Sequence, residues 1–263
     1  MRPPRTPMQV STENLGSVHT QSLTYILRQL GVSLAVTTYQ AGKLFLVRAE
    51  DEVTNTHFRL FPKPMGLARG PNRLTMGVTA QILDFQNIPA ATGRLDPPDK
   101  HDALYLPRAT AVTGDIDIHE MAWAGNELWF VNTRFSCLCT LDPAYSFVPR
   151  WRPTFVTAYD MRDRCHLNGL AVRDGQPRYV TALGETDEPG GWRANKAGGG
   201  ILVDIQSNRV LARGLSMPHS PRWYRDRLWF LESGRGTLNA LDLETGENIR
   251  VAALPGFTRG LDF

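Results

Sequence analysis

Three histidines could together bind a divalent metal ion. His119 and His219 lie in the similar segments DIHEMAW and MPHSPRW, and His166 lies in a related segment, RCHLNGLA. Imidazole rings brought to one level can hold Zn, Fe, Cu or Ni and leave positions open for water or substrate. We therefore predict a metal site of these three histidines. Two alternatives remain open, which are structural hydrogen bonding of the rings and contact with a substrate without metal.

Charged residues near the same strand ends could take part in a reaction. We predict Glu232 and Arg134 as catalytic residues, with Glu232 as general base or fourth metal ligand. The alternative for Glu232 is a salt bridge with Arg134 or Arg222. Asp117 precedes His119 by two residues, so on a strand both side chains would share a face, and Asp117 could orient the ring.

Further residues could bind the substrate. Arg222 and Arg259 could hold an anionic group, because a guanidinium matches a carboxylate or phosphate with two hydrogen bonds; the alternative for either is stacking on a tryptophan. Asn132 lies at a strand end next to the predicted site. Trp192 and Arg193 lie between glycines, a pattern typical of a mobile lid or of an exposed loop tip.

An internal repeat predicts the elements that position these residues. Residues 118–133 match residues 218–233, with Trp123 aligned to Trp223, and residues 166–183 and 64–79 follow the same pattern. Each unit predicts a strand, a tight turn and a second strand, and two more strands follow the first two units. Four strands recurring at about fifty residues indicate the blades of an all-β propeller.

The connections between the strands differ in length. In a propeller blade, alternate connections emerge on opposite faces, and the turns of one face are short here. Three long connections, 87–115, 153–164 and 184–199, are predicted on the face that carries the histidines. Long loops in a compact domain are commonly functional, which favours this face as the site; the alternative is a set of tolerated surface insertions.

The ends of the chain are less regular. Residues 1–16 are expected to be a disordered tail, followed by a single propeller domain over 17–263. The spacing of leucines predicts a short helix over 17–30, with Gly31 ending it. The last residues, 257–263, read as the first strand of a further blade, which would either close a five-bladed ring or begin a sixth blade.

Composition limits the classes of partner. The chain has 263 residues, a formal net charge of +3 and no basic cluster, so nucleic acid is not an expected partner. No apolar run is long enough to span a membrane. The three cysteines, an odd number with two in a C-x-C pair, do not indicate a disulfide framework, which favours a cytoplasmic protein. The expected partner is a small-molecule or peptide ligand, with a protein partner as an alternative.

Several longer segments resemble an uncharacterised bacterial family of conserved hypothetical proteins. They include LWFVNTRFSCLCTLD, PRYVTALGETD and LPGFTRGLDF, and the resemblance runs from about Gly31 to the end. Members of that family continue for about another blade, so the resemblance implies a six-bladed parent, about five blades here and a C-terminally shortened chain. The architecture is similar to that of six-bladed propellers such as peptide-amidating lyase, whose zinc is held by three channel histidines, although fold alone does not imply function.

Two functions therefore remain open from the sequence. The first is a metal-dependent propeller enzyme of lyase, hydrolase or oxidative type that acts on a small molecule or peptide. The second is a non-catalytic propeller that recognises a peptide, glycan or protein partner on the same face.

Overall fold

The computed structural model describes residues 18–98 and 100–263, so the expected tail over 1–16 lies outside the described residues. The described residues form an all-β fold with one α-helix, as predicted. The elements in chain order are α1 (Gln21–Leu30), β1 (Leu34–Thr38), β2 (Lys43–Glu50), β3 (Val53–Leu60), β4 (Leu67–Gly70), β5 (Arg73–Gly77), β6 (Gln81–Asn87), the 3-10 helix η1 (Pro89–Arg94), β7 (Tyr105–Val112), β8 (Ile118–Ala124), β9 (Glu127–Asn132), β10 (Cys137–Thr140), β11 (Val148–Trp151), β12 (Leu167–Arg173), β13 (Gln176–Ala182), η2 (Gly191–Asn195), β14 (Gly200–Asp204), β15 (Arg209–Leu215), β16 (Pro218–Tyr224), β17 (Arg227–Glu232), β18 (Thr237–Leu241) and β19 (Asn248–Ala253).

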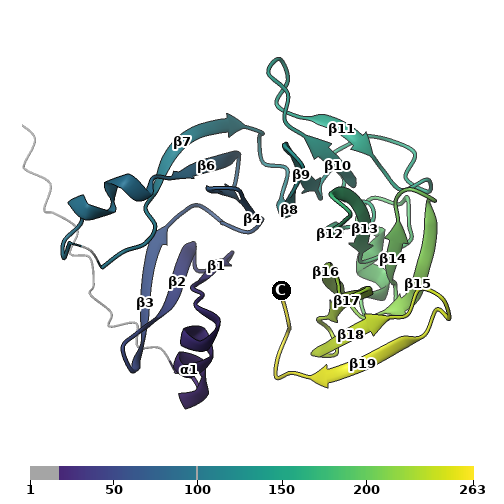
Figure 1. Ribbon diagram of the computed structural model, residues 1–263. Coiled ribbons are helices and arrows are strands. Elements are labelled where there is room, and N and C mark those ends of the chain that lie inside the picture. Colours follow the sequence, from purple (N-terminus) through teal and green to yellow (C-terminus); the bar gives the residue numbers. More distant parts are fainter. Residues whose placement is uncertain (1–17, 99) are drawn as a thin grey trace, which may run out of the picture. The chain divides into compact units, whose positions relative to one another are not determined.

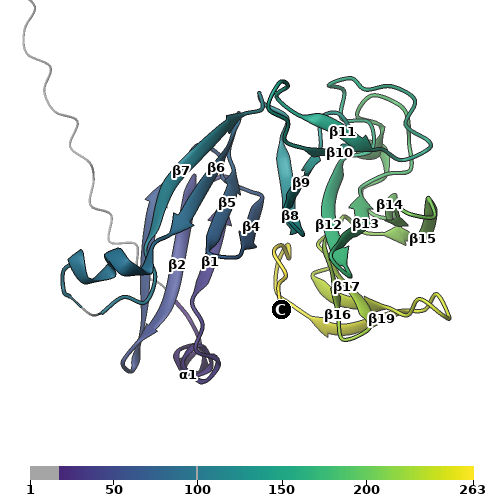
Figure 2. The same ribbon diagram turned by 45° about the horizontal axis from the view of Figure 1, so that its top comes forward.

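The strands form five propeller blades. One sheet is three-stranded, β1-β2-β3, and four are four-stranded: β4-β5-β6-β7, β8-β9-β10-β11, β12-β13-β14-β15 and β16-β17-β18-β19. Each four-stranded sheet is an antiparallel meander of consecutive strands, and β16 to β19 show it clearly in yellow-green in Figures 1 and 2. The repeat in the sequence thus predicted the strands of these blades.

The chain divides into two compact units. The first combines the described residues up to Val36 with Phe45–Arg59, and the second combines Thr37–Leu44 with Leu60–Phe263. In the first unit, α1 buries Leu27 and ends at Gly31, whose φ of 61° is the left-handed conformation expected after a helix. The candidate site lies entirely in the second unit.

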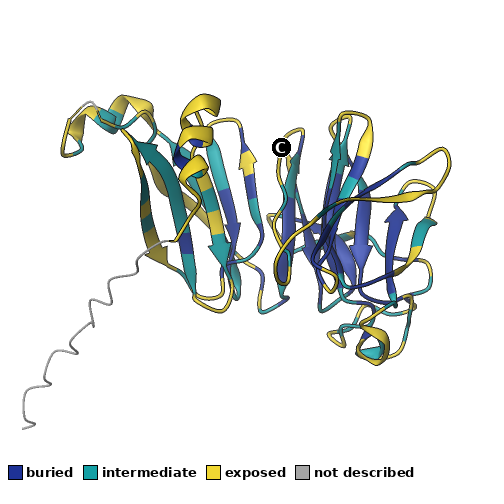
Figure 3. Ribbon diagram, turned by 90° about the horizontal axis from the view of Figure 1, so that it is seen from below, coloured by how far each residue is buried: buried dark blue, intermediate teal, exposed yellow. Residues whose placement is uncertain are grey.

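The core of the second unit lies between successive blades. One apolar cluster joins the β4 and β8 blades, a second joins the β8 and β12 blades, and a third joins the β12 and β16 blades. Figure 3 shows this pattern as dark blue inner strands with yellow on outer strands and turns. The cysteines are buried and unbridged, and Cys137 and Cys139 belong to the first of these clusters. Because each blade covers its neighbour's face, the inner strands are fixed relative to one another.

Close packing between blades leaves no room for a side chain at Gly200. A Cβ atom there would lie 2.3 Å from Cδ of Pro218 and 2.6 Å from the carbonyl oxygen of Leu215. We expect Gly200→Ala to lower the free energy of unfolding by about 1–3 kcal/mol, measured by urea denaturation. Gly93→Ala is the control, because no atom lies within 4 Å of its Cβ position. Equal denaturation midpoints for the Gly200 variant and the wild type would contradict this view of the interface.

Two predictions about connections were wrong. Residues 87–115 are not one loop, since β7 occupies Tyr105–Val112 as the outer strand of its blade. The remaining loop joins the third strand to the fourth, which places it on the tight-turn face; Asn87 N–H indeed donates to the Asn72 carbonyl in the β4–β5 turn. Residues 257–263 form no strand, although they do approach the histidines.

Candidate functional site

The strand register places His119 and His219 at one position but not His166. His119 lies five residues before the end of β8, and His219 lies five residues before the end of β16. The matching position of β12 is Asn168, because all three hairpins have the same two-residue turn. His166 lies two residues earlier, before β12 begins. His166 was expected in register with the other two only if the extra residues of its unit lie in the turn. The turn has two residues, as in the other hairpins, so this condition is not met and His166 lies outside the register.

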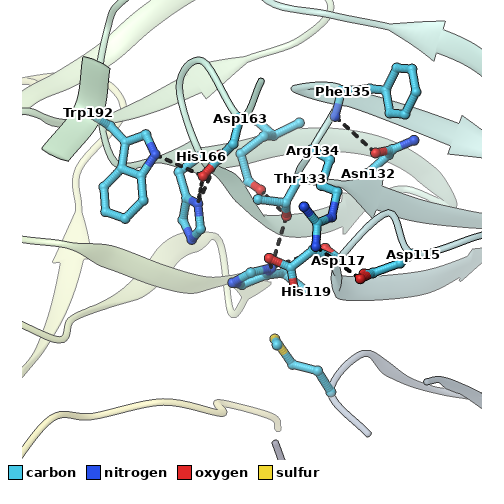
Figure 4. A network of polar contacts seen from close by, with 12 residues as sticks. Asp115, Asp117, His119, Asn132, Thr133, Arg134, Phe135, Asp163, His166 and Trp192 are labelled. Atoms are coloured by element: carbon cyan, nitrogen blue, oxygen red, sulfur yellow. Dashed lines mark hydrogen bonds and ion pairs between the residues drawn. The ribbon is translucent and has the colours of Figure 1, made fainter. Parts of the chain in front are cut away.

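The loop before β12 nevertheless brings His166 to His119. His166 has a φ of 51°, a left-handed backbone conformation that turns its side chain out of the strand alternation. The ring centroids of His119 and His166 lie 4.8 Å apart, with the planes edge to face at 81°. Figure 4 shows both rings with one nitrogen in the dashed contacts and the other turned away from them.

A hydroxyl relay holds His119 in one tautomer. Nδ1 lies 2.9 Å from the Thr133 hydroxyl and 3.2 Å from the Asp117 carbonyl oxygen. The same hydroxyl donates its proton to the Leu167 carbonyl oxygen at 2.6 Å, so it must accept from Nδ1–H. The lone pair of His119 is consequently on Nε2. The relay begins in one blade and ends on the first strand of the next.

The same relay recurs one repeat later. Nδ1 of His219 lies 2.8 Å from the Ser233 hydroxyl, which donates to the Thr258 carbonyl oxygen at 2.6 Å. The Met217 carbonyl oxygen is a second acceptor at 2.9 Å. Phe257 then lies against His219, with centroids 5.9 Å apart, as His166 lies against His119. The last residues of the chain therefore take the place that the loop and start of β12 take one repeat earlier.

Burial keeps both relayed histidines neutral. Burial lowers the pKa of His119 well below its usual range, and the neighbouring His166 and Arg259 lower it further. Burial also lowers the pKa of His219 well below its usual range, with Arg259 as the next cause. A neutral imidazole with Nδ1 protonated offers Nε2 as an acceptor or metal ligand.

Asp163 organises the surroundings of His166. Its carboxylate lies 2.9 Å from Nδ1 of His166 and accepts from the Trp192 indole N–H at 2.9 Å and from Arg193 at 3.4 Å. Trp192 also packs on the His166 ring at a centroid distance of 4.3 Å. This tryptophan is buried, so it is not an exposed loop tip. Asp163 was not among the residues predicted from the sequence; its position three residues before His166, in a long connection, was the available signal.

The other predicted polar residues are held by structural contacts. Glu232 accepts from Ser216 N–H, Asn239 and Arg235, so its ion-pair partner is neither Arg134 nor Arg222. Arg134 forms an ion pair with Asp115 at 3.0 Å. Asn132 is fully buried and accepts from the Phe135 N–H in the β9–β10 turn. Asp117 contacts the His119 ring through its carbonyl oxygen at 3.2 Å, with its carboxylate 3.8 Å away.

The two predicted arginines differ in their partners. Arg222, on β16, pairs with Glu120, on β8, at 3.2 Å and also donates to the Leu170 carbonyl oxygen on β12. This pair therefore joins the inner strands of two blades that have a third blade between them. Arg259 instead donates a hydrogen bond to Sδ of Met65 at 3.5 Å.

A complete metal-ligand group is not assembled. Over residues 18–98 and 100–263, no three or more His, Cys, Asp and Glu side chains lie together as a group that could hold a metal ion. His119 and His166 are in ring contact, and His219, one repeat further on, is near enough to lower the pKa of His119. The site thus consists of a histidine pair with a third imidazole nearby.

The comparison with protein families decides the classification. A model described as "Domain of unknown function (DUF4915)" matches residues 21–263. The chain belongs to this family. The match includes every residue of the candidate site, so the histidines and their relays lie inside the DUF4915 domain.

Solved structures similar to this DUF4915 chain share its fold. A candidate oxidoreductase (glucose dehydrogenase) from Thermus thermophilus aligns with a TM-score of 0.55 and 13% identity, over 87% of this chain and 84% of that chain. Virginiamycin B lyase from Staphylococcus aureus aligns with a TM-score of 0.47 and 12% identity, over 86% of this chain and 67% of that chain. A streptogramin B lyase aligns with a TM-score of 0.48 and 10% identity, over 83% of this chain and 64% of that chain. At these identities the first of the three alignments supports the fold and nothing more, and the two lyase alignments carry no argument.

No curated protein gives a significant match to the DUF4915 chain. Among the described residues, no helix is both long and apolar enough to cross a membrane.

Proposed function

We propose that His119, His166 and His219 bind a divalent transition metal ion and that this face is the active site of a propeller enzyme. The observation that supports the proposal is the commitment of all three Nδ1 atoms to acceptors, which leaves each Nε2 available. Metal-binding histidines usually donate their other ring N–H to a carboxylate, a carbonyl or a similar acceptor. Here the acceptors are the hydroxyls of Thr133 and Ser233 and the carboxylate of Asp163.

The chemistry of the donor set fits Zn, Fe, Cu or Ni. Neutral imidazole nitrogens suit these ions better than Mg or Ca, which prefer oxygen ligands. His119 and His166 would supply two ligands as a pair and His219 a third. When bound, such an ion polarises a substrate carbonyl or activates a water molecule, which suits lyase, hydrolase or oxidative reactions on a small molecule or peptide.

The remaining residues of the site position and enclose the substrate. Asp163 orients His166, and Trp192 covers one face of the same ring and keeps water from it. Glu232 and Arg134 were predicted to be catalytic, but each is already engaged in an ion pair, so we assign no step to either. We propose a small-molecule or peptide ligand for this face.

Metal analysis tests the proposal directly. Protein purified without a histidine tag would be stripped with a chelator, reloaded with each ion in turn and measured by mass spectrometry of the metal. We expect about one ion per chain in the wild type, as for a three-histidine site with open positions, and loss of that ion in His166→Ala. His57→Ala is the matched control, since His57 lies on β3, outside the proposed site.

The outcomes separate the two candidate functions. Absence of bound metal under every loading condition would exclude the hypothesis of a metal-dependent enzyme. The alternative is a non-catalytic face that recognises a peptide, glycan or protein partner; it would be favoured if single histidine substitutions changed stability while ligand binding stayed the same.

A further inference from the structure

Arg259 lies outside the ion pairs of the described residues, although the charges of Glu120 and Asp117 act on it from a greater distance. A guanidinium has five N–H donors, but the hydrogen bond it makes here is to the thioether of Met65, a weak acceptor. Over residues 18–98 and 100–263, Arg259 belongs to no ion pair. Arg222 differs, because Glu120 pairs with it and Asp262 lies 3.7 Å from its Nε.

The backbone around Arg259 is tied to the histidine site on both sides. The carbonyl oxygen of Thr258 ends the relay of His219, and the N–H of Gly260 donates to the Ser220 hydroxyl at 3.2 Å. Residues 257–263 form no strand, yet these two bonds hold the arginine next to β16. Its position is therefore set by the same contacts that orient His219.

The electrostatics beside the histidines favour a negatively charged ligand. Arg259 directly follows Phe257 and Thr258, which contact the His219 ring and the end of its relay. Of the two nearest carboxyl groups, Glu120 is paired with Arg222, and the Asp117 carboxylate lies 3.8 Å from Nδ1 of His119. An exposed guanidinium outside any ion pair of the described residues thus belongs to the segment that contacts His219.

We propose that the substrate of this site carries an oxyanion, a carboxylate or a phosphate, which Arg259 binds with two parallel hydrogen bonds while the rest of the molecule lies at His119 and His166. The proposal rests on the proposed function for its reacting part and names the class of substrate. It also gives different roles to the two arginines that were predicted from the sequence to bind the substrate. Arg259 binds the ligand, and Arg222 holds the inner strands together through Glu120.

Calorimetric titration with inorganic phosphate and with acetate tests the proposal. Both anions would be titrated at constant ionic strength into metal-stripped protein and into metal-loaded protein. We expect saturable binding of at least one anion to the wild type, weakened about tenfold or more in Arg259→Gln, since a hydrogen bond to a charged group is lost. Arg259→Lys should be intermediate, because an ammonium keeps the charge but not the planar pair of donors.

Arg209→Gln is the control for net charge. Arg209 lies at the exposed start of β15, next to a turn of the opposite face, so its replacement should leave anion affinity unchanged. Phosphate binding stronger than acetate binding would assign the oxyanion as a phosphate, and the reverse order as a carboxylate. Undiminished binding in Arg259→Gln, or no saturable binding of either anion, would overturn the proposal. Because the stripped protein is measured separately, this result is independent of whether metal binds.

Discussion

Replacing Arg222 by methionine is expected to lower the free energy of unfolding by about 3 kcal/mol. The change leaves Glu120 buried without its partner, and breaking a buried ion pair typically costs roughly 3–5 kcal/mol. We expect the low end of this range because Arg222 keeps some solvent exposure and Arg259 still interacts with Glu120. The measurement is equilibrium denaturation in urea.

Arg213→Met is the matched control for that change. Arg213 pairs with Glu185 at 2.6 Å, but both side chains are exposed, and exposed pairs contribute about 0–1 kcal/mol. The double variant Glu120→Gln/Arg222→Met should recover part of the loss, since no buried charge is left unpaired. Similar losses in Arg222→Met and Arg213→Met would show that the pair between β8 and β16 does not help to hold the inner strands.

Replacing Thr133 by valine is expected to weaken metal binding about tenfold to a hundredfold. Residues that orient a metal-binding histidine typically contribute this much to affinity. Valine keeps the shape of threonine but cannot accept from Nδ1 of His119 or donate to the Leu167 carbonyl oxygen. Affinity would be measured by competition with a chromogenic chelator.

Thr133→Ser controls for the side chain's shape, because serine retains the hydroxyl and should bind metal nearly as the wild type does. Nitrogen-15 NMR of metal-free protein gives a second readout: wild-type His119 should show a protonated Nδ1, and the valine variant a larger share of the Nε2–H tautomer, because only the longer contact to the Asp117 carbonyl oxygen remains. Unchanged affinity and an unchanged tautomer in Thr133→Val would contradict a role for the relay.

The relay of histidine, hydroxyl and carbonyl oxygen occurs twice and follows the order of the repeats. In both relays the histidine comes from the first strand, the hydroxyl follows the second strand, and the carbonyl belongs to the next repeat. Thr133 and Ser233 occupy matching sequence positions, so the hydroxyls were visible in the alignment of 118–133 with 218–233. The carbonyl oxygens of Leu167 and Thr258 could not be predicted as their partners, because a backbone atom contributed by the next repeat is not identified by any residue type.

The sequence by itself determined the strands of the repeated hairpins, their tight turns, the α1 helix and the propeller class. These features follow from local apolar periodicity and turn chemistry, which act over a few residues. It also determined that His119 and His219 are equivalent, because equal spacing from a turn of equal length fixes a position on a strand.

Only the tertiary structure decided which side chains meet. The left-handed backbone of His166, just before β12, brings its ring to His119. Asp163 and Trp192 lie in two different loops and form a hydrogen bond with each other. Strand alternation predicts neither contact. Likewise, Glu120 and Arg222 lie 102 residues apart in the chain and meet because stacked blades bring their inner strands together. Contacts of this kind depend on how the blades pack, and packing is a property of the whole unit and not of any one segment.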